Sequence, residues 1–353
     1  YFIGYLLLTP VYVGLTDKYD AKWIVIIASI SVCLACFSLW FFAVGFWSTC
    51  LIWGVVGSGL AGTYMPGLQV LNDRLNMTDR VKLTPWYTSS FGLSNGISFA
   101  VIGYLFANFS WKIACYTTSI SAALSAIIIL FLITSHNQKK NITERKFFDL
   151  RPAFKNKEAL GYIFSYGTHT YELFAYRAWI FTFLLWASLR TPNTISSELI
   201  SLIIGIFMFI GMVSSLMGAK FCLDFGRKKV LMIIGFATFV FSVICAISIS
   251  LPIWIIIILV GIYHAFIMLD SGALTAGTVS VSDDNERGAI LAFHSIIGFA
   301  GGAIAGPIIG FILDVNGGTN NTSAWIFAFI SMGLGSLFVF LIQYRSLVTR
   351  IKN

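Results

Sequence analysis

Four side chains that could bind a ligand or a proton lie in a long, mostly apolar segment between about residues 160 and 185. They are His169, Glu172, Tyr176 and Arg177. A segment of this length can cross a bilayer as a helix, and ionisable groups at that depth usually face a bundle interior or a water-filled cavity. There they can bind a ligand or carry a proton. The alternative is a structural role, in which the same groups form buried pairs that hold neighbouring helices together.

The spacing of these residues separates them into two directions around a helix. His169 and Glu172 are three residues apart and Tyr176 is four further on, so the three share one face. Arg177 points about 140° away from Glu172 and needs a partner of its own. A guanidinium group presents a two-pronged set of donors that suits an anion, such as a substrate carboxylate.

Four further polar residues lie inside other apolar segments: Asn95, His264, Asp270 and His294. Asp270 and His294 have a similar depth relative to the loop that joins their segments, so they could pair as a gate or a proton relay. The alternative for both is a structural hydrogen bond between adjacent helices. Asn95 is either a substrate contact or an interhelical bond. A carboxyl group removed from water takes up a proton more readily, which suits Glu172 and Asp270 to proton transfer.

The composition excludes a soluble globular protein. Of the 353 residues, 58% are hydrophobic and 11% are charged, whereas soluble chains carry about 25% charged residues. The formal net charge of +8 could suggest nucleic-acid binding. However, the basic residues lie in short loops between apolar segments, which is typical of cytoplasmic loops in membrane proteins. We therefore expect an integral, multi-pass membrane protein that does not bind nucleic acid.

Apolar segments long enough to span a bilayer recur along the whole chain and predict an all-α, polytopic fold. The expected helices are 1–16, 23–43, 48–71, 86–107, 113–134, 159–186, 196–221, 230–250, 252–279, 289–313 and 323–344. The loops between them alternate between basic and nearly uncharged. The positive-inside rule assigns the basic loops and the C-terminus to the cytoplasm.

The longest basic loop divides the chain into two parts. We predict an N-terminal transmembrane half at 1–134, a cytoplasmic connector at 135–157 and a C-terminal transmembrane half at 158–353. The first part contains five expected helices and the second contains six. Because the sequence opens on apolar residues without an initiator Met, we interpret it as a fragment that lacks one helix, which would make the halves six and six.

Two short loops repeat one pattern, in which an acidic residue precedes a basic cluster between two helices. The first loop contains Gly14, Asp17, Lys18 and Lys22, and the second contains Asp224, Gly226, Arg227 and Lys228. Their positions correspond in the two halves. Repeated halves are typical of transporters built from structural repeats.

With these loops the chain resembles the major facilitator superfamily (MFS) of secondary transporters. Their pattern is similar to the signature Gly-x-x-x-Asp-Arg/Lys-x-Gly-Arg/Lys-Arg/Lys, although Asp20 stands where the second Gly is usual and Asp224 is shifted by one position. The resemblance implies an MFS fold of two six-helix halves, a small-molecule substrate and alternating access. The Gly-Pro-x-x-Gly-Gly motif of drug/proton antiporters is absent around Asn95.

From Arg177 and the missing antiporter motif we expect proton-coupled import of a small organic anion. Efflux of lipophilic compounds and substrate sensing without transport remain alternatives. Neither a channel nor an intramembrane enzyme is favoured, because the acidic-basic loops are duplicated and no His-Glu-x-x-His motif occurs. The expected location is the bacterial inner membrane, and no oligomer is required.

The cysteines do not predict a metal or redox site. Cys33-x-x-Cys36 has suitable spacing, but no second pair follows it and its neighbours are apolar. We interpret all six cysteines as small buried hydrophobic residues. We therefore expect no cofactor and no metal.

Overall fold

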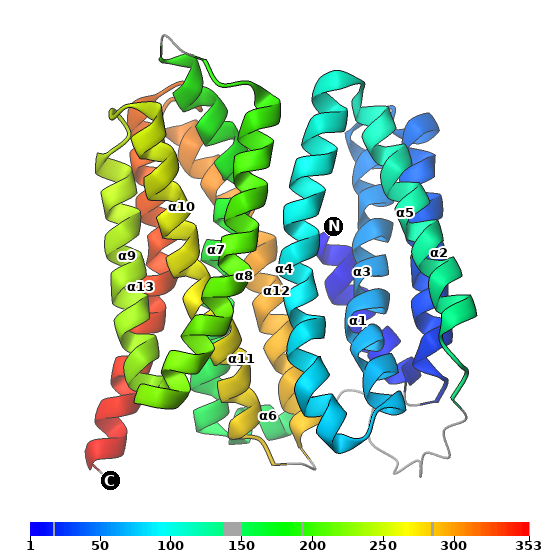
Figure 1. Cartoon of the computed structure of the whole chain (residues 1–353). Coiled ribbons are helices and arrows are strands. Elements are labelled where there is room, and N and C mark those ends of the chain that lie inside the picture. Colours follow the sequence, from blue (N-terminus) through cyan, green and yellow to red (C-terminus); the bar gives the residue numbers. More distant parts are fainter. Residues whose placement is uncertain (17, 137–149, 192–193, 284–285, 353) are drawn as a thin grey trace. The chain divides into compact units, whose positions relative to one another are not determined.

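The computed structural model describes residues 1–16, 18–136, 150–191, 194–283 and 286–352. The described residues form thirteen helices and no strand, which confirms the all-helical prediction (Figure 1). The helices are α1 (Phe2–Thr16), α2 (Ala21–Phe42), α3 (Phe46–Arg74), α4 (Met77–Asn108), α5 (Trp111–Leu132), α6 (Arg151–Lys155), α7 (Lys157–Leu189), α8 (Ser197–Phe225), α9 (Arg227–Ile247), α10 (Ile253–Leu269), α11 (Ser271–Ser280), α12 (Arg287–Val315) and α13 (Thr322–Lys352).

Two features differ from the eleven expected spans. A short helix, α6, lies directly before α7, within the stretch predicted as a connector. The expected span 252–279 is broken at Asp270, which ends α10 and begins α11. No proline lies at this break, and Gly272 follows it by two residues. The break places a carboxyl group at a point where the regular helix is interrupted.

Eight helical segments among the described residues are long and apolar enough to cross a membrane. One of them combines α10 and α11 as Ile253–Ser280. The long helices α3 and α7 are not among the eight. For α7 the reason is the set of ionisable and hydroxyl side chains that it carries, which lower its mean hydropathy.

The described helices form two compact units. The first comprises Tyr1–Phe91 and Tyr104–Asp149, and the second comprises Gly92–Gly103 and Leu150–Asn353. In the first unit, α2 packs against α3 and α5, and α1 packs against α3. In the second unit, α7 contacts α12, α13, α11 and α10. The predicted connector 135–157 lies largely outside the described residues, so its boundaries stay a prediction.

Helix α7 is defined at both ends by its sequence. At the start, the side chain of Asn156 accepts a hydrogen bond of 2.9 Å from the backbone N–H of Ala159. This bond satisfies one of the donors that every helix start leaves unpaired. At the other end, the guanidinium of Arg190 lies 4.6 Å from the ring centroid of Trp186. Between these ends α7 has 33 residues and holds the candidate residues inside the second unit.

Candidate functional site

Close packing of α12 on α7 brings the candidate residues into a dense interface. A Cβ added to Gly301 of α12 would lie 2.2 Å from the carbonyl oxygen of Gly167, so only glycine permits this approach. The hydroxyl of Thr170 donates a hydrogen bond of 2.7 Å to the carbonyl of Gly298. The glycines of 298–310 therefore allow the backbones of α7 and α12 to touch, as small residues do between membrane helices.

Glu172 lies at the centre of this unit and is 2% exposed. Its Oε1 accepts a hydrogen bond of 2.6 Å from the hydroxyl of Tyr263 and one of 3.2 Å from Ser336. Tyr263 belongs to α10 and Ser336 to α13, so the carboxyl group joins three helices. Within the described part of the chain, no Lys, Arg or His forms an ion pair with it. An ionised carboxyl group away from water needs a cation, donors or a proton.

His169 pairs with Asp270 one helical turn before Glu172. Its Nδ1 lies 2.7 Å from Oδ1 of Asp270, and the two side chains are 2% and 5% exposed. The expected pairing of Asp270 with His294 is therefore wrong. Asp270 lies at the break between α10 and α11, and its carboxyl group faces His169 of α7.

His294 of α12 instead contacts α11 and α7. Its Nε2 lies 3.3 Å from the hydroxyl of Thr275, and its Nδ1 lies 3.1 Å from the hydroxyl of Thr278. The ring of Tyr166 stacks on His294 with centroids 4.0 Å apart. The same tyrosine ring is 5.8 Å from that of His169, so it lies between the two histidines.

Tyr176 completes the face predicted for α7. Its hydroxyl donates a hydrogen bond of 3.0 Å to the carbonyl of Val260 on α10. His264, also on α10, stacks on Tyr176 at 5.0 Å and is fully buried. Neither ring nitrogen of His264 has a hydrogen-bond partner among the described residues. His169, Glu172 and Tyr176 thus all contact α10 or the residue that ends it.

The other two candidates, Arg177 and Asn95, do not belong to this face of α7. Arg177 lies elsewhere on α7, and Asn95 lies on α4. Arg177 is half-buried as a residue, and its guanidinium lies 5.7 Å from the ring centroid of Phe174, within the range of a cation–π contact. Asn95 is half-buried on α4, in the stretch Gly92–Gly103 that belongs to the second unit. Their roles in transport stay predictions.

In the first acidic-basic loop, Asp17 lies outside the described residues. The structure describes the residues on both sides of it. Gly14 is buried at the end of α1, and Lys18 is exposed. Lys22 is 5% exposed, and its Nζ donates hydrogen bonds of 3.0 and 2.5 Å to the carbonyls of Leu130 and Ile133. These bonds connect the start of α2 to the end of α5.

Asp20, the departure from the signature, forms an ion pair in the same region. Nη2 of Arg74 lies 2.9 Å from both carboxylate oxygens of Asp20. The backbone N–H groups of Lys22 and His136 also donate to this carboxylate, at 3.0 and 2.8 Å. Burial alone would raise the pKa of Asp20, but these donors and the Arg74 charge outweigh it, so the pKa is lowered.

The second acidic-basic loop makes its contacts within its own unit. Gly226 joins α8 to α9 with a φ of +91°, a conformation that favours glycine. Nη1 of Arg227 donates a hydrogen bond of 2.6 Å to Ser280 at the end of α11. Nζ of Lys228 lies 2.6 Å from Oε1 of Glu158 at the start of α7. Asp224 is exposed.

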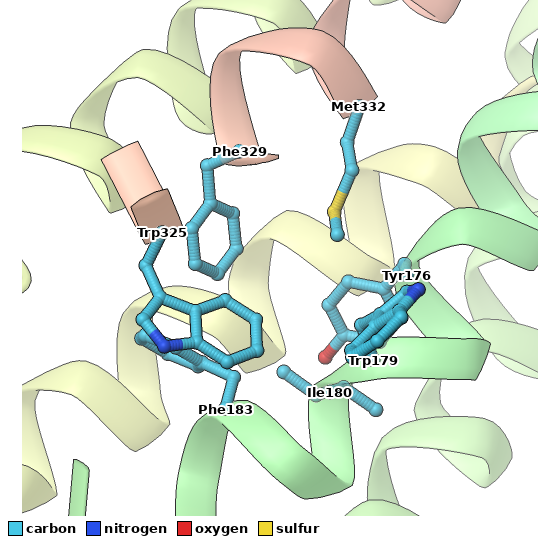
Figure 2. Close-up of a pocket in the computed structure, with 7 residues that line it drawn as sticks. All are labelled: Tyr176, Trp179, Ile180, Phe183, Trp325, Phe329 and Met332. Atoms are coloured by element: carbon cyan, nitrogen blue, oxygen red, sulfur yellow. The ribbon is translucent and has the colours of Figure 1, made fainter. Parts of the chain in front are cut away.

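Beyond Tyr176, α7 and α13 form an aromatic cluster, shown in Figure 2. The empty space among these side chains totals about 160 Å³, and no part of it is wide enough for a water molecule. The side chains are Tyr176, Trp179, Ile180, Phe183, Trp325, Phe329 and Met332. Phe183 contacts Phe329 edge to face at 4.8 Å. The cluster is a closed apolar layer.

Three polar contacts were not predicted from the sequence. In the sequence Tyr263 is marked only by its place beside His264, and nothing distinguishes Ser336 from the other serines of α13. Tyr166 resembled the other aromatic residues of an apolar span. The one available signal was helical spacing, since Tyr166 precedes His169 by three residues and so shares its face.

Comparison with known proteins identifies the fold. The sequence matches the Major Facilitator Superfamily over residues 1–189 and 170–350. No curated protein matches the chain in sequence.

Several solved transporters share the fold of the whole chain. A variant of the nucleoside transporter NupG has a TM-score of 0.74 and 15% identity, with 97% of this chain and 87% of that chain covered. A D-xylose-proton symporter has a TM-score of 0.74 and 14% identity, covering 96% and 84%. The E. coli fucose:proton symporter FucP has a TM-score of 0.63 and 12% identity, covering 98% and 88%. The similarity to these structures shows the fold, and the sequence match shows that the chain is an integral membrane transporter of the major facilitator superfamily.

Proposed function

We propose that this transporter couples the import of a small organic anion to protons by alternating access. The observation that carries the proposal is the environment of Glu172, which is buried, bonded by Tyr263 and Ser336, and without an ion pair among the described residues. Such a carboxyl group can exist as a neutral acid or, through its two donors, as a carboxylate. It can therefore carry one proton in each cycle.

The position of Arg177 supports the proposal that the substrate is an anion. Its guanidinium lies beside Phe174 on α7, five residues after Glu172. A buried or half-buried guanidinium binds carboxylate and phosphate groups with two parallel hydrogen bonds. The similar structures are those of a nucleoside transporter, a D-xylose-proton symporter and a fucose:proton symporter. Neutral polar solutes are therefore the alternative substrates against which anion uptake is compared.

Purified protein in proteoliposomes tests the proposal. With an acidic exterior, we expect radiolabelled lactate or gluconate to accumulate, whereas xylose and uridine do not. Arg177→Lys should weaken anion binding roughly tenfold, or about 1.4 kcal/mol, because lysine lacks the two-pronged geometry. Arg190→Lys, at the exposed end of α7, is the matched control and should leave uptake unchanged.

The other outcomes separate the alternatives. Accumulation of xylose or uridine in place of the anions would replace the anionic substrate with a neutral one. Binding without accumulation would favour a sensor. Extrusion of lipophilic dyes from the vesicles, with no anion uptake, would favour an efflux transporter.

We also infer that the basic loops face the cytoplasm and that the membrane is the bacterial inner membrane. The Lys/Arg bias of the loops supports this orientation. Single cysteines at Tyr19 and Val44, which are 61% and 87% exposed on successive loops, test it in a cysteine-free background. An impermeant thiol reagent should label Val44→Cys from outside the cell and Tyr19→Cys only after lysis. Labelling of both from outside would reverse the conclusion.

A further inference from the structure

The side chains on α7 differ in character on the two sides of Glu172. Toward the start of α7 lie His169 and Tyr166, each one turn further from Glu172. Toward its end lie Tyr176, Trp179 and other members of the aromatic cluster. The two sides of Glu172 therefore differ in their ability to carry a proton.

The first contact on the polar side is the pair of His169 and Asp270. Glu172 and His169 share a face of α7 one turn apart, and Nδ1 of His169 lies 2.7 Å from Asp270. The other ring nitrogen of His169, Nε2, is buried and has no hydrogen-bond partner among the described residues. An imidazole that uses one nitrogen for a carboxylate and has the second available is suited to passing a proton.

The next contacts lead from α7 to α11 and α12. Tyr166 stacks between His169 and His294, at 5.8 and 4.0 Å. Both ring nitrogens of His294 contact threonine hydroxyls on α11, Thr275 and Thr278. His294 is 4% exposed, so these hydroxyl groups replace water around its ring.

The contacts then reach the loop between α11 and α12. The hydroxyl of Ser282 donates a hydrogen bond of 2.6 Å to the carbonyl of Thr278. Asn156 Nδ2 donates one of 2.7 Å to the neighbouring carbonyl of Val281. Asp283, which follows Ser282, is exposed. The series of polar groups thus extends from the centre of α7 to an accessible loop.

On the other side of Glu172 the polar atoms of the aromatic cluster are already occupied by backbone carbonyls. Tyr176 donates to Val260 at 3.0 Å, Trp179 to Gly306 at 3.0 Å, and Trp325 to Thr319 at 2.8 Å. What remains toward the centre of the cluster is mainly apolar and aromatic side-chain surface (Figure 2), with no space for a water molecule. Proton movement requires titratable groups, hydroxyls or water, so this layer blocks it.

We propose that His169, Asp270, His294 and Thr278 form a one-sided proton relay that connects Glu172 with the α11–α12 loop, while the aromatic cluster closes the opposite side. The relay rests on the proposed function of Glu172. In the release step, the carboxylic acid of Glu172 becomes a carboxylate. Its proton passes to the His169–Asp270 pair, and through a water at Nε2 of His169 to His294. The imidazolium of His294 then loses it to water near Ser282 and returns to the neutral form.

Several other titratable groups face the relay. They are Tyr162, Tyr166 and Glu172 from α7, Tyr263 and His264 from α10, and Cys222 of α8, which packs with Leu274 of α11. The pairs Arg227–Ser280 and Lys228–Glu158 lie at the ends of the helices, near the loops. Among the described residues, His169 and His294 are the imidazoles on the side toward the start of α7, while His264 stacks on Tyr176, which follows Glu172 on α7.

Time-resolved infrared spectroscopy on protein in nanodiscs tests the relay without a known substrate. Photolysis of a caged proton starts the reaction, and the carboxylic C=O band of Glu172, assigned by its loss in Glu172→Gln, reports protonation. We expect the rate to fall roughly 100-fold in His294→Gln, a loss typical of a positioned proton-transfer group. Thr278→Val should also slow it, and Thr278→Ser should restore it because the hydroxyl is retained.

Thr238→Val is the matched control. Thr238 is a buried threonine of α9 whose hydroxyl bonds the carbonyl four residues earlier, as that of Thr278 does, but it has no contact with His294. The rate of Glu172 protonation in Thr238→Val should equal that of the wild type. Unchanged rates in both His294→Gln and Thr278→Val would overturn the relay while leaving Glu172 as the proton carrier. If the wild type shows no Glu172 band at any pH, the proposed function itself fails.

Discussion

The hydroxyl of Tyr263 donates a hydrogen bond of 2.6 Å to Oε1 of Glu172 and joins α10 to α7 in the interior of the second unit. Hydrogen bonds to carboxyl groups are stronger than those between neutral groups, particularly away from water. This contact therefore has two consequences. It stabilises the packing of α10 on α7, and it offers the carboxylate a donor after the proton has left.

Tyr263→Phe should lower thermal stability by about 1–3 kcal/mol, because a buried acceptor loses its stronger donor. The measurement is the unfolding midpoint in detergent. Tyr171→Phe is the control, since the half-buried Tyr171 bonds only the hydroxyl of Ser331 in the described contacts, at 3.0 Å. A loss for Tyr263→Phe no greater than that for Tyr171→Phe would show that the Glu172 contact contributes little.

The approach of α12 to α7 predicts a difference between two glycines of one helix. In Gly301→Ala the new Cβ would lie 2.2 Å from the carbonyl oxygen of Gly167, whereas in Gly306→Ala the nearest atom is 3.7 Å away. Overpacking of this kind costs about 1–3 kcal/mol. Gly301→Ala should therefore lower the unfolding midpoint and slow transport, while Gly306→Ala changes neither. Equal effects would contradict the close packing of the two helices.

The interactions of Asp20 predict that its contribution to the stability of the folded protein depends on pH. Burial raises its pKa, but the donors from His136, Lys22 and Arg74 lower it further than burial raises it. A carboxyl group with a lowered pKa in the folded state stabilises the protein above its unfolded pKa of about 3.9, and this contribution is lost as the pH falls through the folded value. The difference in unfolding midpoint between wild type and Asp20→Asn should thus be largest above about pH 4 and shrink below it.

Asp314→Asn, a substitution of an exposed carboxylate on α12, is the control for the loss of a charge. Its midpoint should follow that of the wild type through the same pH range. A difference between wild type and Asp20→Asn that stays constant down to pH values below about 3 would contradict the proposed interactions.

The positions of the helices could be predicted from the sequence, because a bilayer requires long apolar segments whatever their contacts. The same holds for the face shared by His169, Glu172 and Tyr176, which follows from helical spacing alone. Their partners could not be predicted. Tyr263 and Ser336 meet Glu172 only because α10 and α13 pack on α7, and this depends on side chains distant in the sequence.

The one pairing that was wrong involves Asp270, at the break between α10 and α11. An unbroken helix over 252–279 was expected, with an Asp270–His294 pair as one alternative and a structural hydrogen bond between adjacent helices as the other. The residues Leu269-Asp270-Ser271-Gly272 contain no proline, and Gly218 of α8 lies so close to the carbonyl of Leu269 that an added Cβ would be 1.7 Å from its oxygen. A tertiary contact of this kind leaves no periodic signal in the sequence.

Glu172→Gln tests the central claim, that the proton is carried by this carboxyl group. Glutamine retains the size and can still accept from Tyr263 and Ser336, but it does not titrate. In proteoliposomes, the variant should lose accumulation driven by a pH gradient and retain exchange of labelled for unlabelled anion without a gradient. Glu198→Gln, in the first turn of α8, should retain both activities. Accumulation by Glu172→Gln at the wild-type level would contradict the account and leave this carboxyl group with a structural role.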